Sequence, residues 1–267
     1  MEAYESAKEL LKKYGQEHLL VNYENLSDEN KKRLLGQIAE LDFEQVNRLF
    51  NTKDVPKRNG KIEPIGYTDK AKLSEEEIAR FEKIGSEKIR SGKFAALTKA
   101  GGQGTRLGHN GPKGTYMLDV KPKSKPIFEL LCESLKKEVA KYNVNIPWYI
   151  MTSIENNDET IAFFEKNNYF GYNKEDVMFF MQSEIPMVDV NGKILLTEEG
   201  LVKRAADGHG GVFESMHRNG VVSDMHKRNI EWIFISGVDN PLAKAVDELA
   251  IGMGEERRIF IYREVFS

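Results

Sequence analysis

Residues 100–114 read Ala-Gly-Gly-Gln-Gly-Thr-Arg-Leu-Gly-His-Asn-Gly-Pro-Lys-Gly, and a short apolar run at 94–97, Phe-Ala-Ala-Leu, leads directly into them. Glycine residues let a backbone turn tightly and bring its N–H groups close to a bulky anion. Arg106 and Lys113 add fixed positive charge at positions where phosphate oxygens would lie. A strand followed by a glycine-rich loop, an arginine and a lysine predicts a cradle for a nucleoside triphosphate.

This loop matches neither of two common nucleotide-binding glycine motifs. The P-loop pattern G-x-x-x-x-G-K-[ST] does not occur in the sequence. A dinucleotide fingerprint would need its third glycine where Leu107 stands, and Gly108 comes one residue late, which argues against a Rossmann-type cofactor binder. The other alternative is a structural turn without a ligand, although connections between elements are usually only about 2–6 residues long.

Length and composition describe an ordinary globular protein. The 267 residues are 40% hydrophobic and carry a net charge of -3, which gives no overall attraction to nucleic acid or membranes. No apolar run approaches the roughly 18 residues of a membrane helix, and the polar, acidic N-terminus is not a signal peptide. The single cysteine, Cys132, lies among leucines and is expected to be a buried structural thiol. We therefore expect a cytoplasmic protein without nucleic-acid or membrane partners.

The sequence predicts a helical N-terminal region over residues 1–92. Apolar residues at 34, 35, 38 and 41 have helical spacing, and Ser-Glu-Glu-Glu at 74–77 is a capping box that opens a further helix. Proline and glycine residues between 51 and 72 predict a loop. We see no catalytic constellation in this region and expect it to pack as a helical cap on the domain that follows, with a partner-binding role as the alternative.

From residue 93 to 267 the pattern alternates between strands and helices, which predicts an α/β domain with a mostly parallel central sheet. The fully apolar run at 232–236 is typical of a central parallel strand. Residues 189–194 predict a hairpin with an Asn-Gly turn. The other expected strands and helices lie at 94–97, 148–152, 177–182, 126–142, 156–167 and 212–218.

Three chemically distinctive features each follow directly on an apolar strand. These features are the glycine loop, Gln182 and Asp239. In an open α/β sheet, ligands bind outside the carboxyl ends of the strands. We therefore expect the three features to lie at one edge of the sheet.

Four segments, in order, resemble one family. Gly-Gly-x-Gly-Thr-Arg-Leu-Gly at 101–108, followed by Pro-Lys-Gly, resembles the signature of the eukaryotic-type UDP-sugar pyrophosphorylases, which are UTP:sugar-1-phosphate uridylyltransferases. Phe-Phe-Met-Gln-Ser-Glu-Ile-Pro at 179–186 resembles the family's uracil-reading segment, and Asp-Gly-His-Gly-Gly at 207–211 resembles its second glycine motif. Gly-Val-Asp-Asn at 237–240 resembles its metal-binding strand end and is more similar to the N-acetylhexosamine branch than to the glucose branch.

The resemblance implies a GT-A-like nucleotidyltransferase fold and a role for each matching residue. Arg106 would hold the β- and γ-phosphates as a catalytic residue, and Lys113 would lie nearer the α-phosphate. His209 and Asn240 would form the wall of the sugar site. The residues that would bind the nucleotide are Gly101, Gly102, Gln103, Gly104, Thr105, Gln182, Pro186, Gly210 and Gly211.

Asp239 and Gln182 each have a functional and a structural interpretation. A carboxylate at Asp239 suits Mg²⁺, which prefers one or two carboxylates together with phosphate oxygens and water, and the alternative is a helix N-cap. The Gln182 amide can both donate to and accept from the uracil edge, and the alternative is plain polar surface. The resemblance favours Mg²⁺ and uracil.

By resemblance, the reaction is transfer of UMP from UTP to N-acetylglucosamine-1-phosphate or glucose-1-phosphate, with Mg²⁺, giving a UDP-sugar and pyrophosphate. The resemblance covers roughly residues 94–252, and the sequence after Gly252 no longer follows the family, whose members continue well beyond this point. We therefore expect a C-terminally truncated chain that lacks most of the sugar-binding half. The alternative function is a catalytically impaired nucleotide-binding fragment.

Overall fold

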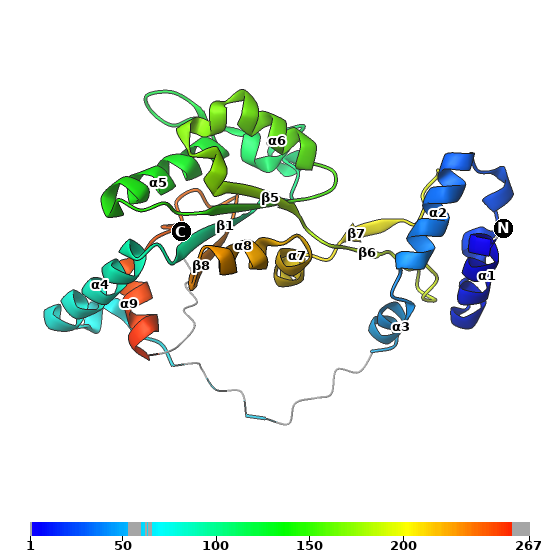
Figure 1. Ribbon diagram of the computed structural model, residues 1–267, viewed down its shortest axis with the longest axis horizontal. Helices are drawn as coiled ribbons and strands as arrows, with labels where there is room; N and C mark the ends of the chain where they lie inside the picture. The colour runs from blue at the N-terminus through cyan, green and yellow to red at the C-terminus, as the bar shows by residue number, and fades with distance from the viewer. Residues whose placement is uncertain (1, 53–59, 62, 64–65, 258–267) are drawn as a thin grey trace. The chain divides into compact units, whose positions relative to one another are not determined.

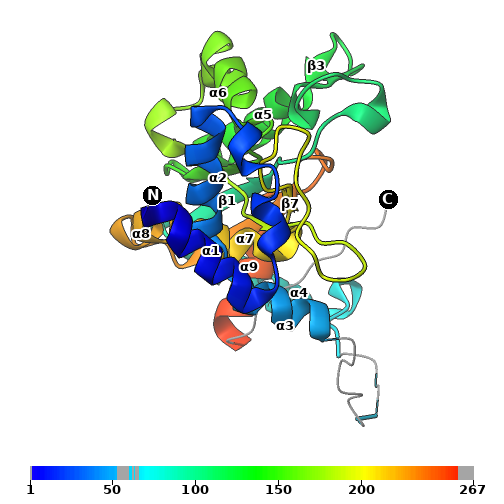
Figure 2. The ribbon, with the colours of Figure 1, turned by 90° about the vertical axis from the view of Figure 1, so that its right-hand side faces the viewer.

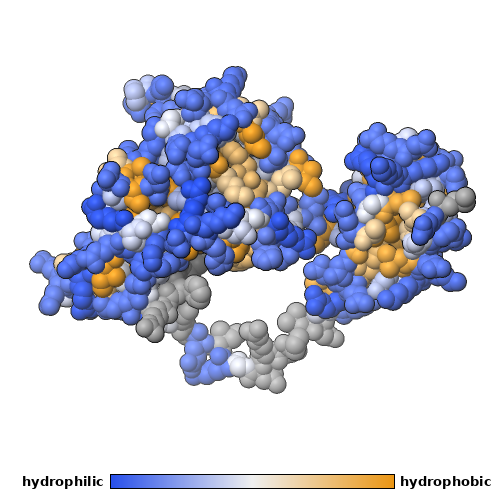
Figure 3. Space-filling view, in the orientation of Figure 1, coloured by the Kyte–Doolittle hydropathy of each residue, from blue (hydrophilic) through white to orange (hydrophobic). Residues whose placement is uncertain are grey.

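The computed structural model describes residues 2–52, 60–61, 63 and 66–257 of the chain. The chain folds into two compact units, each assembled from segments that are distant in sequence (Figure 1). Unit 1 comprises residues 1–65 and 184–207, and unit 2 comprises residues 66–183 and 208–267. Both units present a mostly hydrophilic surface with smaller apolar areas (Figure 3).

Unit 1 is built on three amphipathic helices, of which α1 and α2 lie side by side (Figure 2). Their bounds are Glu2–Tyr14 for α1, Asp28–Glu40 for α2 and Phe43–Asn51 for α3. The second helix starts at Ser27, whose hydroxyl accepts a hydrogen bond from the Asn30 N–H at 3.2 Å. The helical character predicted for this part of the sequence is confirmed.

A hairpin from the middle of the chain completes the core of unit 1. Strands β6 (Glu184–Pro186) and β7 (Arg204–Ala206) pair antiparallel, and the segment between them folds back on the helices. The buried side chains from the two parts are Leu11, Leu19, Leu34, Ile38, Phe43, Ile194, Leu201 and Val202. Apolar surface from helices and hairpin is therefore buried in one shared core.

The hairpin predicted at 189–194 is present, but its turn differs from the one expected. The Gly192 N–H donates to the Asp189 carbonyl at 3.1 Å, so Val190 and Asn191 are the central pair. Gly192 follows with a φ of 77°, and the Asp189 carboxylate accepts from the Asn191 and Lys193 N–H groups. The prediction of a two-residue Asn-Gly turn is wrong, because the side chain of Asp189 stabilises a turn one residue earlier.

Unit 2 contains a four-stranded parallel sheet in the order β5-β4-β1-β8, with helices on both faces (Figure 1). The strands are β1 (Phe94–Lys99), β4 (Trp148–Thr152), β5 (Val177–Met181) and β8 (Trp232–Gly237). One face carries α5 (Ile127–Tyr142) and α6 (Asn157–Lys166), and the other carries α7 (Val212–Arg218) and α8 (Val221–Lys227). This is the α/β class with a parallel central sheet that the sequence predicts.

Alternation along the strands divides the apolar residues between the two helical layers. Ala96 and Trp148 belong to the core under α5 and α6, whereas Ala95 and Tyr149 belong to the core under α7 and α8. Successive side chains of a strand point to opposite faces, so a strand covered on both faces is apolar throughout. Cys132 of α5 is fully buried, and burial raises the pKa of its thiol to about 12, as expected of a structural thiol.

The fourth helix, α4 (Glu75–Arg90), belongs to unit 2, whereas the sequence suggested a division at residues 92 and 93. The predicted capping box at Ser74 and Glu77 is present. The helix packs on α9 (Glu248–Arg257) so closely that a Cβ atom on Gly85 would lie 1.9 Å from the Glu248 carbonyl oxygen. The helix thus joins the α/β unit through contacts with a segment about 160 residues later, which helical periodicity cannot reveal.

Strand β8 is parallel, as predicted, but it is not central. Within the described residues it pairs with β1 alone and is half-buried along its whole length. The apolar composition of a strand reports burial of its faces and not the number of its neighbours, which explains the difference. Two short strands, β2 (Met117–Leu118) and β3 (Lys125–Pro126), pair with each other after the glycine loop.

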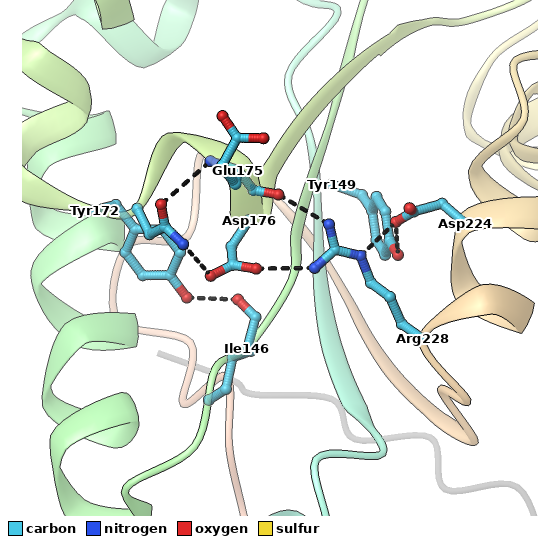
Figure 4. Close-up of polar contacts among 8 residues, drawn as sticks. Ile146, Tyr149, Tyr172, Glu175, Asp176, Asp224 and Arg228 are labelled. Atoms are coloured by element: carbon cyan, nitrogen blue, oxygen red, sulfur yellow. Dashed lines mark hydrogen bonds and ion pairs between the residues drawn. The ribbon is translucent and has the colours of Figure 1, made fainter.

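A polar network joins the amino ends of β4 and β5 to α8 (Figure 4). The Arg228 guanidinium donates to the Asp224 carboxylate at 2.9 Å, to the Asp176 carboxylate at 2.8 Å and to the Glu175 carbonyl at 2.8 Å. The Tyr149 hydroxyl donates to the Asp224 carboxylate at 2.8 Å. Asp176 and Tyr149 are buried, so this network ties the helical layer to the sheet with its charges paired.

Candidate functional site

The glycine loop begins where β1 ends and folds back on itself. The Gly104 N–H donates to the Gly111 carbonyl at 2.9 Å, and the Lys113 N–H donates to the Gly102 carbonyl at 3.0 Å. Two single turns of 3-10 helix, η4 (Thr105–Leu107) and η5 (Lys113–Thr115), lie within the loop. The backbone of the loop is therefore fixed by its own hydrogen bonds.

The two predicted cations differ in their surroundings. Arg106 is exposed on η4 and has no ion-pair partner among the residues that the structure describes. Lys113 is more enclosed, and its Nζ lies 3.8 Å from Oδ2 of Asp239. The structure thus brings together Lys113 and Asp239, which are far apart in sequence.

Asp239 occupies a turn directly after β8. Because β8 lies beside β1, the Val238 N–H donates to the Lys99 carbonyl at 3.0 Å, at the point where the glycine loop starts. The Asp239 carboxylate folds back over Gly237, where a Cβ atom would lie 2.4 Å from Oδ1. No helix begins in the fully described stretch 240–247, so the helix N-cap interpretation of Asp239 is wrong.

Gln182 follows β5, and its side chain lies directly against Gly101. A Cβ atom on Gly101 would come within 2.7 Å of the Gln182 amide oxygen, so only glycine fits there without displacing the amide. The Gln182 N–H donates to the Thr152 carbonyl at 2.8 Å, which holds the residue at the end of β4. The expected meeting of the glycine loop, Gln182 and Asp239 at the carboxyl edge of the sheet is therefore confirmed.

Two residues of the α7 region fix the backbone on either side of Gln182, and neither was predicted from the sequence. The hydroxyl of buried Ser215 accepts a hydrogen bond from the Ser183 N–H at 2.9 Å. The Asn219 amide donates to the Met181 carbonyl at 3.1 Å. No short motif marks such residues, because they act on a strand end more than 30 residues earlier.

Asn156 is a third residue that the sequence analysis missed. Its side chain is fully buried between the end of β4 and the start of the glycine loop. The amide nitrogen donates to the carbonyls of Ala100 at 3.1 Å and Gly102 at 3.4 Å, and the amide oxygen accepts from the Ser153 N–H at 2.8 Å.

The remaining predicted residues are less closely connected. Gly210 and Gly211 belong, with His209, to the single 3-10 turn that opens α7. Asn240 is exposed after Asp239, and Thr105 is exposed in η4. Pro186 lies in β6 of unit 1, whereas the other predicted site residues lie in unit 2. The side-chain oxygen of Gln103 is buried and has no hydrogen-bond partner among the described residues.

The acidic and histidine side chains of the described chain do not form a ready-made metal centre. No group of three or more His, Cys, Asp or Glu side chains that could hold an ion occurs among the residues that the structure describes. A single exposed carboxylate such as Asp239 still fits Mg²⁺, which takes its other ligands from substrate phosphates and water. The magnesium prediction remains a prediction.

A cavity of about 240 Å³ lies in unit 1, between the end of α1, helix α3 and the 189–194 turn. None of the predicted site residues lines it. None of the helices in the described part of the chain is both long enough and apolar enough to cross a membrane.

The sequence also matches one known protein family. A family model described as UTP–glucose-1-phosphate uridylyltransferase matches residues 43–265. The chain belongs to this family. The match begins well before residue 94 and continues beyond residue 252, so the limits that we expected for the resemblance were too narrow.

Several individual proteins that are similar to this chain are named as UDP-N-acetylglucosamine pyrophosphorylases. The chain is 35% identical, over 90% of its length, to a probable UDP-N-acetylglucosamine pyrophosphorylase from Schizosaccharomyces pombe. It is similar in structure to the uridine diphosphate N-acetylglucosamine pyrophosphorylase from Trypanosoma brucei in complex with inhibitor, with a TM-score of 0.78, 28% identity and 97% of this chain covered. A putative UDP-N-acetylglucosamine pyrophosphorylase from Entamoeba histolytica gives a TM-score of 0.62 at 35% identity, over 68% of this chain.

The matches cover much less of the relatives than of this chain. The aligned part is 52% of the Schizosaccharomyces pombe protein, 55% of the Trypanosoma brucei chain and 47% of the Entamoeba histolytica chain. The chain thus spans about half the length of the relatives that it matches.

Proposed function

We propose that this chain is a UTP:sugar-1-phosphate uridylyltransferase whose nucleotide site lies at the carboxyl edge of the sheet in unit 2. The main support is that a glycine loop, a glutamine amide and a lysine–aspartate pair meet at this edge. The Gln182 side chain lies against Gly101, and Lys113 Nζ lies 3.8 Å from Asp239. The family membership supports the same reaction, and the predicted cytoplasmic location stays a prediction.

The proposed reaction needs positioning and charge neutralisation rather than covalent help from the protein. An oxygen of the sugar-1-phosphate attacks the α-phosphorus of UTP in line, forming the new P–O bond as the bond to the pyrophosphate leaving group breaks. Arg106, which is exposed and without an ion-pair partner in the described chain, is free to bind the β- and γ-phosphates. Lys113 would neutralise charge nearer the α-phosphate.

Base recognition is assigned to Gln182. One side-chain amide can accept a hydrogen bond from the uracil N3–H and donate one to a uracil carbonyl. The hydrogen bonds from the Gln182 N–H to Thr152 and from the Ser183 N–H to Ser215 fix the backbone that carries this amide. Gly210 and Gly211 would allow the base or ribose to approach closely, and His209 and Asn240 complete the proposed set in unit 2, whereas the role of Pro186 stays a prediction.

Mg²⁺ is assigned to Asp239 as the cofactor of the reaction. When bound there together with phosphate oxygens, the ion would neutralise charge on the triphosphate. The exposed Asp239 carboxylate leaves room for the phosphate oxygens and water that would complete the coordination of the ion.

The sugar is proposed from the relatives alone. The protein from Schizosaccharomyces pombe is named for UDP-N-acetylglucosamine, whereas the family model is described by glucose-1-phosphate. We therefore propose N-acetylglucosamine-1-phosphate as the acceptor, with glucose-1-phosphate as the alternative.

Pyrophosphate release from the purified chain tests this function. The chain would receive UTP and Mg²⁺ with N-acetylglucosamine-1-phosphate, glucose-1-phosphate or galactose-1-phosphate in parallel. We expect release with the first sugar, none without sugar, and none when a chelator removes Mg²⁺.

Release with a different sugar would correct the acceptor. If folded chain releases nothing but binds UTP in preference to ATP and NAD, the alternative of a catalytically impaired nucleotide-binding fragment replaces the enzyme. If folded chain does not bind UTP at all, the proposed nucleotide site is wrong.

A further inference from the structure

We propose that Asn156 is a positioning residue that holds the start of the glycine loop in the shape that binds phosphate. This inference rests on the proposed nucleotide site and deepens it. The residue lies outside the four segments that resemble the family and is not expected to touch the substrate.

The side chain of Asn156 hydrogen-bonds to the start of the glycine loop and not to its own helix. Asn156 stands at the N-cap position of α6, where an asparagine side chain usually accepts a hydrogen bond from the first turn. Here it makes no such bond. The amide reaches across to β1 and donates to the carbonyls of Ala100 and Gly102, at 3.1 and 3.4 Å.

The orientation of the amide follows from its partners. Its oxygen accepts from the Ser153 N–H at 2.8 Å, and its nitrogen faces two carbonyl oxygens that can only accept. A single side chain thus satisfies three backbone groups that belong to two neighbouring strand ends. The Asn156 side chain is 0% exposed, so water cannot reach these backbone groups without a rearrangement of the structure.

The two carbonyls that Asn156 holds flank Gly101. This is the glycine against which the Gln182 amide packs, and the carbonyl of Gly102 also accepts from the Lys113 N–H at 3.0 Å. Asn156 therefore supports the point at which the loop, the proposed base-reading amide and the lysine segment are connected. Losing its donation leaves the buried Ala100 carbonyl unpaired and the Gly102 carbonyl with the Lys113 N–H alone, which favours other loop conformations.

If the loop adopts its binding conformation in only a fraction of the molecules, the apparent affinity for the ligand falls by that fraction. The phosphates of UTP contact this loop in the proposed site, whereas uridine lacks them. A defect in loop positioning should therefore weaken UTP more than uridine. A general loss of stability would weaken both alike.

The test uses Asn156→Asp, which keeps the shape of the side chain and the acceptor for Ser153 but places a carboxylate oxygen before the two carbonyls. Asn167→Ala is the control, because Asn167 is the C-cap of the same helix and its side-chain amide donates to the Phe163 carbonyl within that helix, at 2.8 Å. Asn156→Ala, which adds no charge, replaces Asn156→Asp if the latter does not fold.

We expect folded Asn156→Asp to bind UTP about 10- to 100-fold more weakly, the loss that an unpaired buried carbonyl at Ala100 predicts. We expect the affinity of the same variant for uridine to fall by less than about threefold. Amide hydrogen exchange, measured without ligand, should quicken at Gly104 and Lys113, whose N–H groups close the loop. Asn167→Ala should change none of these quantities.

Unchanged exchange at Gly104 and Lys113 in the folded variant would overturn the proposal, whether or not the chain binds UTP. Equal losses for UTP and uridine, or no loss of either, would overturn it as well. If the unsubstituted chain binds no UTP, the proposed function fails on that measurement. Quickened exchange would then still establish that Asn156 orders the loop, without the role in phosphate binding.

Discussion

At the amino ends of the strands in unit 2 Arg228 and Asp176 are paired with each other, whereas at the carboxyl ends Arg106 and Asp239 are exposed. Arg228 donates to two carboxylates and a carbonyl, and Asp176 beside it is only 7% exposed. Asp239 at the opposite edge is 67% exposed, with Lys113 at 3.8 Å. Both edges belong to the same parallel sheet.

This contrast separates two uses of the same residue types. A guanidinium whose three nitrogens all donate to protein acceptors stabilises the fold. A cation held on a fixed backbone without a partner is available for an anion that arrives later. The comparison predicts that substitutions at the carboxyl edge change function and that substitutions at the amino edge change stability.

The largest effect is expected at the carboxyl edge, for Arg106→Ala. Removing one preorganised donor to a developing charge usually costs about 100- to 1000-fold in rate. Because Arg106 has no ion-pair partner within the described chain, the melting temperature should stay unchanged. Pyrophosphate release and thermal unfolding would be measured on the same preparation, and Asp239→Ala should behave in the same way.

Arg218→Ala is the matched control for this prediction. Arg218 is exposed on α7 and pairs with Glu214 four residues earlier, at 2.6 Å. Its loss should leave the rate of release unchanged. Wild-type activity in Arg106→Ala would remove this arginine from the proposed site.

The next effect is expected at the amino edge, for Arg228→Ala. It leaves buried Asp176 without its cation, which should lower the free energy of unfolding by about 2–3 kcal/mol. Urea denaturation would measure this loss. UTP affinity of the folded variant should remain within about twofold of the original, because the substitution removes no contact at the carboxyl edge.

Arg228→Lys sharpens the result, since lysine keeps the charge but cannot donate to three acceptors in the guanidinium geometry. We expect it to lie between the original chain and Arg228→Ala in stability. A fall in UTP affinity that exceeds the fall in stability would contradict the division of roles between the two edges.

The smallest effect is expected for Tyr149→Phe in the same network. Its hydroxyl donates to Asp224, which still pairs with Arg228 afterwards, so a loss of only about 1 kcal/mol in unfolding free energy is expected. Burial, and then the hydrogen bond to Asp224, raises the pKa of Tyr149.

This shift gives the prediction a pH dependence. The Tyr149 hydroxyl stays protonated in the folded chain, whereas in the unfolded chain it ionises near its usual pKa of about 10. Its contribution is therefore complete below about pH 10 and declines as the pH rises further. The difference in unfolding free energy between the original chain and Tyr149→Phe should shrink above that pH. A constant difference would contradict this role of the Tyr149 hydroxyl.

Much of the site could be predicted because its chemistry is carried by residues in short local patterns. Glycine at 101 and 102, Arg106 and Lys113 lie within one loop, and apolar strands before Gln182 and Asp239 placed these residues at a common edge. Parallel strands end at the same side of a sheet, so order along the chain sufficed for this expectation.

The supporting residues could not be predicted in this way. Asn156 looks like an ordinary helix N-cap in the sequence, and Ser215 looks like a small helical residue. Each acts on a backbone group that is brought beside it only by the packing of the sheet and helices. Hydrogen bonds of this kind depend on distance in space, for which a single sequence has no periodic signal.

The sequence by itself determined the α/β class, most strands and helices of unit 2, and the glycine loop with its two cations, because periodicity and turn chemistry are local properties. Tertiary structure alone decided that residues 184–207 share a core with the N-terminal helices and that α4 packs on α9. It also decided which side chains hold the site in place. Burial of apolar surface and pairing of buried polar groups join segments that are far apart in the chain, and these energies drive the final arrangement.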